Sequence, residues 1–161
     1  MFERELRSMR LKEIREENEI TQVTISKLLG VSRGTYSLWE LEKDAIPIKR
    51  LNDFCNIFDS SLDYVLELTD IKKYDRSKKE IDRNKSKERL KRIRKENKHT
   101  QEYIGKKFDL DRSLVSKYEK GENIISTTFL VAYAKFYHIS CDYLLGKIDE
   151  AIKINLIKQK N

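Results

Sequence analysis

Residues 21–40 read TQVTISKLLGVSRGTYSLWE, and a version of this stretch occurs a second time in the chain. A shift of 79 positions brings it onto residues 100–119, TQEYIGKKFDLDRSLVSKYE, without a gap. The match extends on both sides, from residues 10–67 onto residues 89–146, and about a third of these positions are identical. Internal repetition of this kind indicates two copies of one structural unit.

Each copy has the pattern of a small helical unit. Apolar residues of the first copy recur at helical spacing, at Leu11, Ile14, Ile25, Leu28 and Leu29. Thr21 and Ser32 can cap the second and third helices, and Pro47 stops the third helix and precedes a fourth. We expect the third helix to run to about Leu41 and a short fifth to begin near Ser61.

The second copy repeats this plan. We expect its first helix to end at Glu96, its second to start at Gln101, and its third to run from Arg112 to about Lys120. A fourth helix then covers residues 127–137, and a fifth begins at Ser140.

Composition supports an all-α fold of two tandem five-helix domains. The chain has 1 proline and 5 glycines, which is too few for a protein rich in turns. Each copy is near the lower size limit of a self-supporting core, so two small cores are plausible. No apolar run approaches the about 20 residues of a membrane span, and the first residues lack a signal-peptide core. We therefore expect a cytoplasmic protein with no membrane contact.

The repeat sets the expected domain limits. The first domain covers residues 1–68, a linker without apolar periodicity covers 69–76, and the second domain covers 77–147. Ser77 to Glu80 has the spacing of a capping box, which extends the first helix of the second copy back to about Lys78. Ile81 aligns with Phe2, so the first copy has room for the same N-terminal extension.

Residues 148–161 form a C-terminal helix or tail. A terminal helix would place four side chains on one face, namely Ile148, Ala151, Ile152 and Leu156. That face either packs on its own domain or joins a second subunit, which leaves a homodimer open.

Charge is spread unevenly, whereas the cysteines are unremarkable. Residues 1–68 carry 10 basic and 13 acidic side chains, for a net charge of −3, and residues 69–161 carry 24 and 14, for +10. The second half is therefore the one that attracts a polyanion. Cys55 and Cys141 occupy different positions in the two copies, so we interpret both as small buried apolar residues.

The pattern from Thr21 to Glu40, matched from Thr100 to Glu119, closely resembles the phage repressor and Cro-like helix-turn-helix family. This resemblance implies a sequence-specific regulator of transcription, a repressor, that binds double-stranded DNA and needs no cofactor or metal. The residues fit the fold physically. Ser26 and Gly105 are small where two helices cross closely, and Gly30 stands at a turn that requires an unusual backbone conformation. Asp109 replaces that glycine in the second copy, which predicts slight strain.

The resemblance also assigns a structural ion pair to each copy. These pairs are Arg15 with Glu40 and Arg94 with Glu119. In the family such a pair joins the first helix to the third. Trp39 and Tyr118 have the spacing of buried positions, so we interpret them as core aromatics and not as platforms for bases.

In related domains the third helix enters the major groove with its N-terminal side chains at base edges. Carried over by position, the DNA-facing set of the first copy is Gln22, Ser32, Arg33, Gly34, Ser37 and Leu38. The set of the second copy is Gln101, Asp111, Arg112, Ser113, Ser116 and Lys117, with Lys106, Lys107 and Lys120 at phosphates. Gln22 and Gln101 would contact phosphate, while Arg33 and Arg112 are the best candidates for direct reading because a guanidinium can grip guanine with two hydrogen bonds.

The copies differ enough to leave an alternative open. Leu38 corresponds to Lys117 and Gly34 to Ser113, so the two surfaces cannot read identical half-sites. The first copy is acidic through Glu16, Glu17, Glu19, Glu42 and Asp44. It could therefore bind a protein partner while the second binds DNA, as in antitoxin-like or anti-CRISPR-like proteins of mobile elements.

An enzyme is the weakest interpretation. The only suggestive cluster is His138, Cys141 and Asp142, whose equivalents in the first copy are Asp59, Leu62 and Asp63. The cluster is therefore not built into the repeated unit, and we expect neither catalytic nor metal-binding residues.

Overall fold

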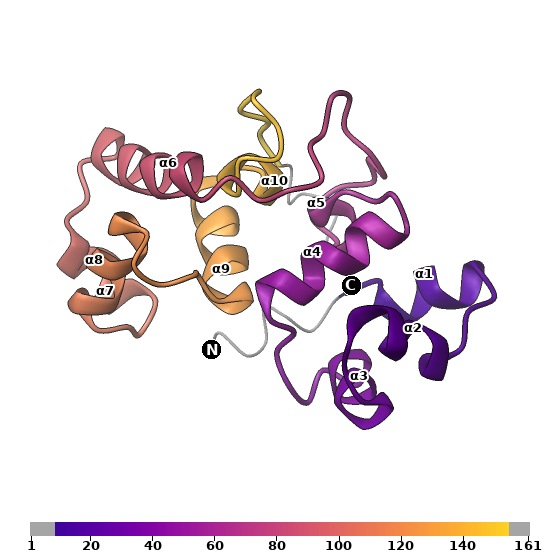
Figure 1. Cartoon of the computed structure of the whole chain (residues 1–161). Coiled ribbons are helices and arrows are strands. Elements are labelled where there is room, and N and C mark those ends of the chain that lie inside the picture. The colour runs from indigo at the N-terminus through magenta and orange to yellow at the C-terminus, as the bar shows by residue number, and fades with distance from the viewer. Residues whose placement is uncertain (1–8, 155–161) are drawn as a thin grey trace, which may run out of the picture.

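A computed structural model describes residues 9–154 of the chain as an all-helical protein with one isolated β-bridge. Its helices are α1 (Leu11–Glu17), α2 (Gln22–Leu29), α3 (Arg33–Glu40), α4 (Ile48–Ile57), α5 (Leu62–Val65), α6 (Arg83–Glu96), α7 (Gln101–Lys107), α8 (Arg112–Lys120), α9 (Thr127–Tyr137) and α10 (Cys141–Leu144). Helices α1–α5 form the first repeat and α6–α10 the second, as Figure 1 shows. The predicted fold of two tandem five-helix units is confirmed.

Most of the described helices begin where a hydroxyl side chain caps a free amide. The capping residues are Thr21, Ser32, Ser61, Thr100, Ser126 and Ser140, each of which accepts a hydrogen bond from the amide three residues later. These caps satisfy amides that have no partner within the helix. They explain why the predicted starts at Gln22, Arg33 and Gln101 agree with the structure, and α9 covers the predicted residues 127–137.

The predicted extension of the second repeat's first helix back to Lys78 is wrong. Helix α6 begins at Arg83, and its cap is Asp82, whose carboxylate accepts from the Lys85 amide. The residues before it bond elsewhere, because the Lys78 amide donates to Lys147 O at 2.8 Å and the Asp82 amide to Leu145 O at 2.9 Å. These long-range bonds hold the segment in an extended path, so the Ser77–Glu80 box does not form a helix start. The corresponding extension before α1, at Phe2, lies outside the described residues.

The predicted linker, residues 69–76, is irregular but firmly packed. Tyr74 is buried, and its hydroxyl donates to Asp63 Oδ2 at 2.8 Å. The Ser61 amide donates to Lys72 O at 2.6 Å, and the Ser61 hydroxyl donates to Ile71 O at 2.9 Å. The connection therefore runs back over the start of α5 and is part of the folded unit.

Of the two predicted alternatives for the C-terminal segment, residues 148–154 form a tail and not a helix. The chain instead runs extended beside the turn after α9, with an antiparallel bridge between Ile139 and Lys153. The Ser140 amide donates to Ile152 O at 2.9 Å, which a helix in the tail would not allow. Ile148 and Ile154 are buried, so the tail packs on its own repeat. Leu156, the last member of the predicted stripe, lies outside the described residues.

Two aspartates at equivalent positions join the repeats. Asp142 accepts hydrogen bonds from the backbone amides of Leu62 at 3.0 Å and Asp63 at 2.9 Å, at the start of α5. Asp63 accepts from the Cys141 amide at 2.6 Å, at the start of α10, and from the Ser140 hydroxyl. Each carboxylate therefore binds the N-terminus of the other repeat's fifth helix, an exchange that gives the pairing an approximate twofold relation.

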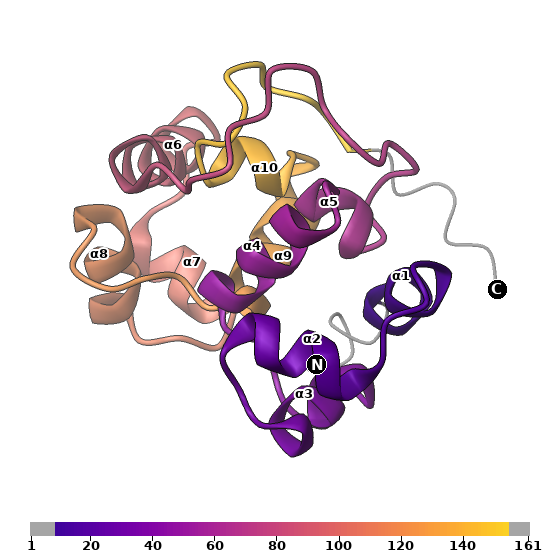
Figure 2. The ribbon, with the colours of Figure 1, turned by 45° about the vertical axis from the view of Figure 1, so that its right-hand side comes forward.

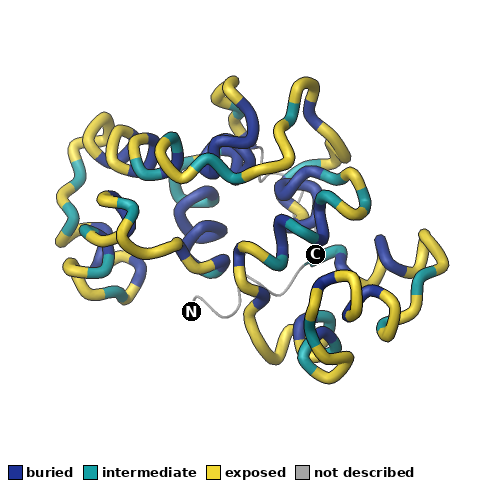
Figure 3. Tube along the Cα trace, in the orientation of Figure 1, coloured by how far each residue is buried: buried dark blue, intermediate teal, exposed yellow. Residues whose placement is uncertain are grey.

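Further contacts make one body of the two repeats. Helices α5 and α10 lie side by side in two views (Figures 1 and 2). The Thr127 hydroxyl donates to Ile46 O at 2.5 Å, and the buried Lys147 ammonium donates to Asn52 Oδ1 at 2.6 Å. Buried residues concentrate along α4, α5, α9 and α10 (Figure 3), and the apolar core is one connected cluster rather than two. None of the helices in residues 9–154 is long and apolar enough to cross a membrane.

Candidate nucleic-acid interface

The first repeat forms a helix-turn-helix from α2 and α3. Helix α2 ends at Leu29, and the next residue, Gly30, adopts a left-handed conformation with φ of 70°, as the turn requires. Ser32 then caps α3 by accepting from the Thr35 amide. Ser26 is buried in α2 where α3 crosses it, and its hydroxyl donates to Val23 O at 2.8 Å. A short side chain that bonds its own helix lets the two helices approach closely.

The second repeat builds the same corner from α7 and α8 with different residues. Gly105 has no room for a side chain, since a Cβ there would lie 2.7 Å from Leu110 O. Asp109 takes the place of Gly30 and has φ of 54°, a conformation that costs aspartate less than most residues. Asp111 occupies the N-cap of α8 but makes no capping hydrogen bond, so its carboxylate lies exposed at the tip of the helix.

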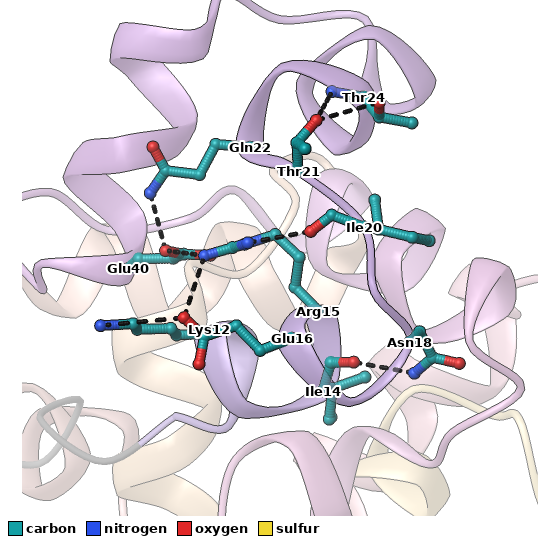
Figure 4. Close-up of polar contacts among 10 residues, drawn as sticks. All are labelled: Lys12, Ile14, Arg15, Glu16, Asn18, Ile20, Thr21, Gln22, Thr24 and Glu40. Carbon is teal, nitrogen blue, oxygen red and sulfur yellow. Dashed lines mark hydrogen bonds and ion pairs between the residues drawn. The ribbon is translucent and has the colours of Figure 1, made fainter.

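A buried ion pair fixes the third helix of the first repeat to α1 and α2 (Figure 4). Arg15 Nε lies 2.5 Å from Glu40 Oε1, and Arg15 Nη2 lies 3.2 Å from Glu40 Oε2. A third bond from this guanidinium reaches Ile20 O at 2.9 Å. Gln22, the first residue of α2, donates to Glu40 Oε2 at 2.8 Å. One carboxylate therefore connects three helices.

The second repeat reproduces this network. Arg94 Nε and Nη2 lie 2.7 and 2.8 Å from the two oxygens of Glu119, Arg94 also donates to His99 O, and Gln101 donates to Glu119. Burial would raise the pKa of Glu40, but hydrogen bonds from Arg15 and Gln22 hold it below its usual value. The carboxylate thus stays ionised at neutral pH and keeps the helices joined. The glutamines expected at phosphate are held by these carboxylates.

The remaining DNA-facing candidates lie on the outer surface of each third helix. In the first repeat Ser32, Arg33, Gly34 and Leu38 are exposed and Ser37 is half-buried. In the second, Asp111, Arg112, Ser113, Lys117 and Lys120 are exposed and Ser116 is half-buried. Lys106 and Lys107, on α7, are exposed as well. Neither Arg33 nor Arg112 makes an ion pair or side-chain hydrogen bond within residues 9–154. Both guanidinium groups are therefore available to a ligand.

Sequence reasoning identified only part of the difference between the two surfaces, including the exchange of Leu38 for Lys117. Exposed apolar side chains on α2 and at the end of α3 have charged equivalents in the second repeat, and the pairs are Val23 and Glu102, Leu28 and Lys107, Leu38 and Lys117, and Leu41 and Lys120. A position-by-position comparison of the copies would have found all of them. The second surface is basic, whereas the first exposes these four apolar side chains and lies in an acidic domain.

Other expectations concern the interior. Trp39 and Tyr118 are buried, as predicted for core aromatics, and so are Cys55 and Cys141. Asp142, the acidic member of the cluster with His138 and Cys141, accepts hydrogen bonds from two backbone amides of the first repeat and is therefore part of the contact between repeats. Within the described residues, no group of histidine, cysteine or acidic side chains is arranged to hold a metal ion.

Comparison with known proteins relates the chain to a protein family. The Helix-turn-helix family model matches residues 11–65 and 90–144. The uncharacterized HTH-type transcriptional regulator YobD of Bacillus subtilis is 30% identical over 61 residues, which is 38% of this chain and 54% of that protein. The uncharacterized HTH-type transcriptional regulator YqaE of the same organism is 37% identical over 60 residues, 37% of this chain and 52% of that protein.

The chain thus spans about half the length of these curated relatives. No solved structure matches it. The two matched regions together cover more than half of the chain and coincide with the two repeats of the fold. The chain therefore belongs to the helix-turn-helix family, in two tandem copies of the phage repressor and Cro-like type.

Proposed function

We propose that this protein is a sequence-specific regulator that binds double-stranded DNA, a repressor that reads the major groove with α3 and α8. The observation that carries the proposal is a matched pair of arginines. Arg33 and Arg112 are the first residues of α3 and α8, both are exposed, and neither has a partner within residues 9–154. A guanidinium in this place can donate two parallel hydrogen bonds to guanine.

The glutamines at the starts of α2 and α7 suit phosphate contacts. Gln22 Nε2 and Gln101 Nε2 each donate one hydrogen bond to the glutamate of their repeat. An amide nitrogen carries two hydrogens, so the second remains for a phosphate oxygen. The glutamate thus orients the donor before DNA arrives, which lowers the entropic cost of the contact.

The second repeat supplies most of the attraction to the backbone. Lys117 and Lys120 lie exposed on α8 without an ion-pair partner in residues 9–154. Lys107 lies 5.1 Å from the ring of Phe136, and Lys106 is 3.3 Å from Glu102 on the same helix. Each lysine that contacts a phosphate releases a counterion, so we expect affinity to fall steeply with salt.

The contact between the repeats makes a single chain the binding unit. It joins α3 and α8 in one folded body, as a homodimer of single units would join its two recognition helices. Leu38 is exposed on α3, and Lys117 is exposed at the equivalent position of α8. The two half-sites that these helices contact therefore differ. We therefore expect a DNA site without palindromic symmetry.

Selection of bound DNA from a random pool tests the proposal. The full chain is then compared with Arg33→Ala, Arg112→Ala and a control, Lys91→Ala, which removes a cation from an exposed position of α6. Losing a bidentate contact to guanine costs about 1–3 kcal/mol, or roughly 5- to 150-fold in affinity. Equal affinity of all four proteins for the selected site would contradict major-groove reading by these arginines.

A specific observation also favours a second function, protein binding by the first repeat. Its helix-turn-helix surface exposes Val23, Leu28, Leu38 and Leu41, which are 40–59% accessible. Apolar side chains at this density are more typical of a protein interface than of a phosphate contact. A footprint on the selected DNA decides between the two. Protection of one half-site, lost in Arg112→Ala and unchanged in Arg33→Ala, would assign DNA to the second repeat alone.

A further inference from the structure

A cleft of about 250 Å³ lies between the two repeats. One wall is α4 of the first repeat, and the opposite wall is the N-terminal half of α6 with the end of α8 and the loop after it. That loop runs past the start of α4 in both ribbon views (Figures 1 and 2). Drug-sized ligands occupy pockets of roughly 300–1,000 Å³, so this cleft suits a smaller molecule.

The body of the cleft is apolar. Ile48 of α4, Ile125 of the second repeat's loop and Leu145 after α10 line it and are buried in the protein. Ile81, half-buried, and Ile124, which is 55% exposed, add further aliphatic surface. A branched or aromatic group would displace water from these side chains, which is the main source of affinity in small pockets.

Two hydroxyl groups in the cleft are free to bind a ligand. Ser86 of α6 and Tyr118 of α8 both line it, and they are 8% and 7% exposed. Neither hydroxyl has a hydrogen-bond partner within residues 9–154. Neither oxygen is among the fully buried polar atoms that lack a partner, so both hydroxyls are open to the cleft and can donate to a ligand that enters it.

The charges of the cleft favour an anion. Lys49 and Lys87 line it without an ion-pair partner in the described residues, and Arg83 donates to a backbone oxygen at 3.1 Å. Two carboxylates also line the cleft, Asp53 and the exposed Glu80. Asp53 is balanced by an arginine 3.8 Å away outside the cleft. The cleft therefore has more cations than carboxylates that lack a nearby cation.

Lys87 is a cleft cation that adjoins both of the helices that carry these hydroxyls. It follows Ser86 in α6, and its side chain lies over the end of α8, because a Cβ on Gly121 would be 3.2 Å from Lys87 Cδ. Its ammonium and the hydroxyls of Ser86 and Tyr118 are hydrogen-bond donors that line the same cleft, and all three suit a carboxylate. Charge-assisted hydrogen bonds of this kind are about twice as strong as neutral ones.

We propose that the cleft binds a small carboxylate with a branched or aromatic apolar body, and that this ligand regulates DNA binding. The regulatory part rests on the proposed function. The ligand would contact α8, which carries the second recognition surface, and α4 of the other repeat at once. A ligand that prefers one spacing of the repeats shifts the protein toward that spacing, and the affinity for a two-part DNA site changes with it.

Amide NMR spectra of the full chain test the site. The probes are 4-methylpentanoate and 3-phenylpropionate, compared with their uncharged primary amides. We expect both carboxylates to shift the amide signals of Ser86, Gly121 and Ile125, and the uncharged amides to bind about tenfold more weakly. Absence of shifts for both carboxylates, or shifts confined to residues outside the cleft, would overturn the proposal.

A matched pair of variants tests the role of charge. Lys87→Gln removes the cation of the cleft, and Lys91→Gln removes one from the exposed face of the same helix. We expect the first to weaken carboxylate binding by about 5- to 10-fold and the second to leave it unchanged. Equal effects of the two variants would show that the carboxylate does not bind at Lys87.

The regulatory step is measured separately, as affinity for selected DNA with and without a probe that binds. A change of at least about threefold supports it, and no change overturns it while leaving the cleft site intact. If the chain selects no DNA at all, the proposed function fails, whereas the NMR shifts still decide whether the cleft binds carboxylates.

Discussion

The contact between Asp63 and Asp142 predicts that two equivalent substitutions have unequal effects. Asp142 receives two backbone N–H groups, one on each oxygen, and these groups can only donate. Asp63 receives one backbone N–H on Oδ1, while its Oδ2 receives the hydroxyls of Tyr74 and Ser140. A hydroxyl can rotate and accept instead. An asparagine NH₂ group therefore fits at position 63, but at position 142 it must face another donor.

The size of the difference follows from these bonds. Either substitution to asparagine leaves one acidic group of the buried pair and removes the repulsion between the two, so that term cancels between them. The remaining difference is in Asp142→Asn, where the buried side-chain NH₂ group has no acceptor, which costs about 1–3 kcal/mol. For a chain of this length, 2 kcal/mol corresponds to about 4–8 °C in Tm. We expect Asp142→Asn to be the less stable variant by this amount.

The dependence of stability on pH gives a second measure of the contact between Asp63 and Asp142. Burial, and then the charge of Asp142, raise the pKa of Asp63 well above its ordinary value of 3.8. The folded chain then binds more protons than the unfolded chain between 3.8 and the raised pKa, so stability falls as pH rises through this window. Asp63→Asn should abolish this fall. Glu40, whose pKa is lowered, contributes the opposite slope but does so equally in both proteins.

Urea unfolding followed by far-UV circular dichroism measures both effects, at pH 7 and then from pH 4.5 to pH 8. Asn at either position keeps the size of the side chain, so the variants compare hydrogen bonds rather than packing. Equal stability of Asp63→Asn and Asp142→Asn at pH 7 would refute the assignment of donors and acceptors. A pH dependence in Asp63→Asn identical to that of the natural chain would refute the role of Asp63 in it.

Further predictions concern the helix-turn-helix units. Gly105→Ala should destabilise the fold by about 1–3 kcal/mol, because its Cβ would lie 2.7 Å from a backbone oxygen, whereas Gly34→Ala, with 4.0 Å of clearance, should be neutral or stabilising in urea unfolding. Arg94→Ala should cost about 3 kcal/mol or more by leaving Glu119 buried without its partner, and a smaller loss in the same assay would mean that water reaches that carboxylate. Lys120→Gln should reduce the slope of log affinity against log salt by about 1, and an unchanged slope would exclude a phosphate contact there.

Local patterns predicted the elements well where the cause is local. The starts of α2, α3 and α7 were predictable because a capping hydroxyl acts within three residues of itself. The error at residues 77–82 and the choice left open at residues 148–154 both lie where backbone groups bond to distant partners. A capping-box spacing or an apolar stripe carries no information about such partners, so tertiary contacts overrode both patterns.

The site shows the same division. The pair Arg15 and Glu40 recurs in the second repeat as Arg94 and Glu119, which the sequence alone shows. The side chains of each pair lie within hydrogen-bonding distance in the structure. The contact between repeats was missed, although Asp63 and Asp142 are identical acidic residues in otherwise apolar surroundings. A buried acid in a short helix indicates that a partner exists, but only the arrangement of the repeats shows that the partner is the other copy's helix.

Because the two units are joined in one chain, their recognition surfaces can carry different residues. In a homodimer every substitution appears on both recognition surfaces, so the two half-sites stay identical. Here the contact between α5 and α10 holds the pair together while α3 and α8 carry different residues, such as Leu38 and Lys117. The elements that join the repeats carry the same aspartate, whereas the exposed positions differ in charge. A cleft between unlike units can likewise have unlike walls, so one ligand can contact both repeats in a single orientation.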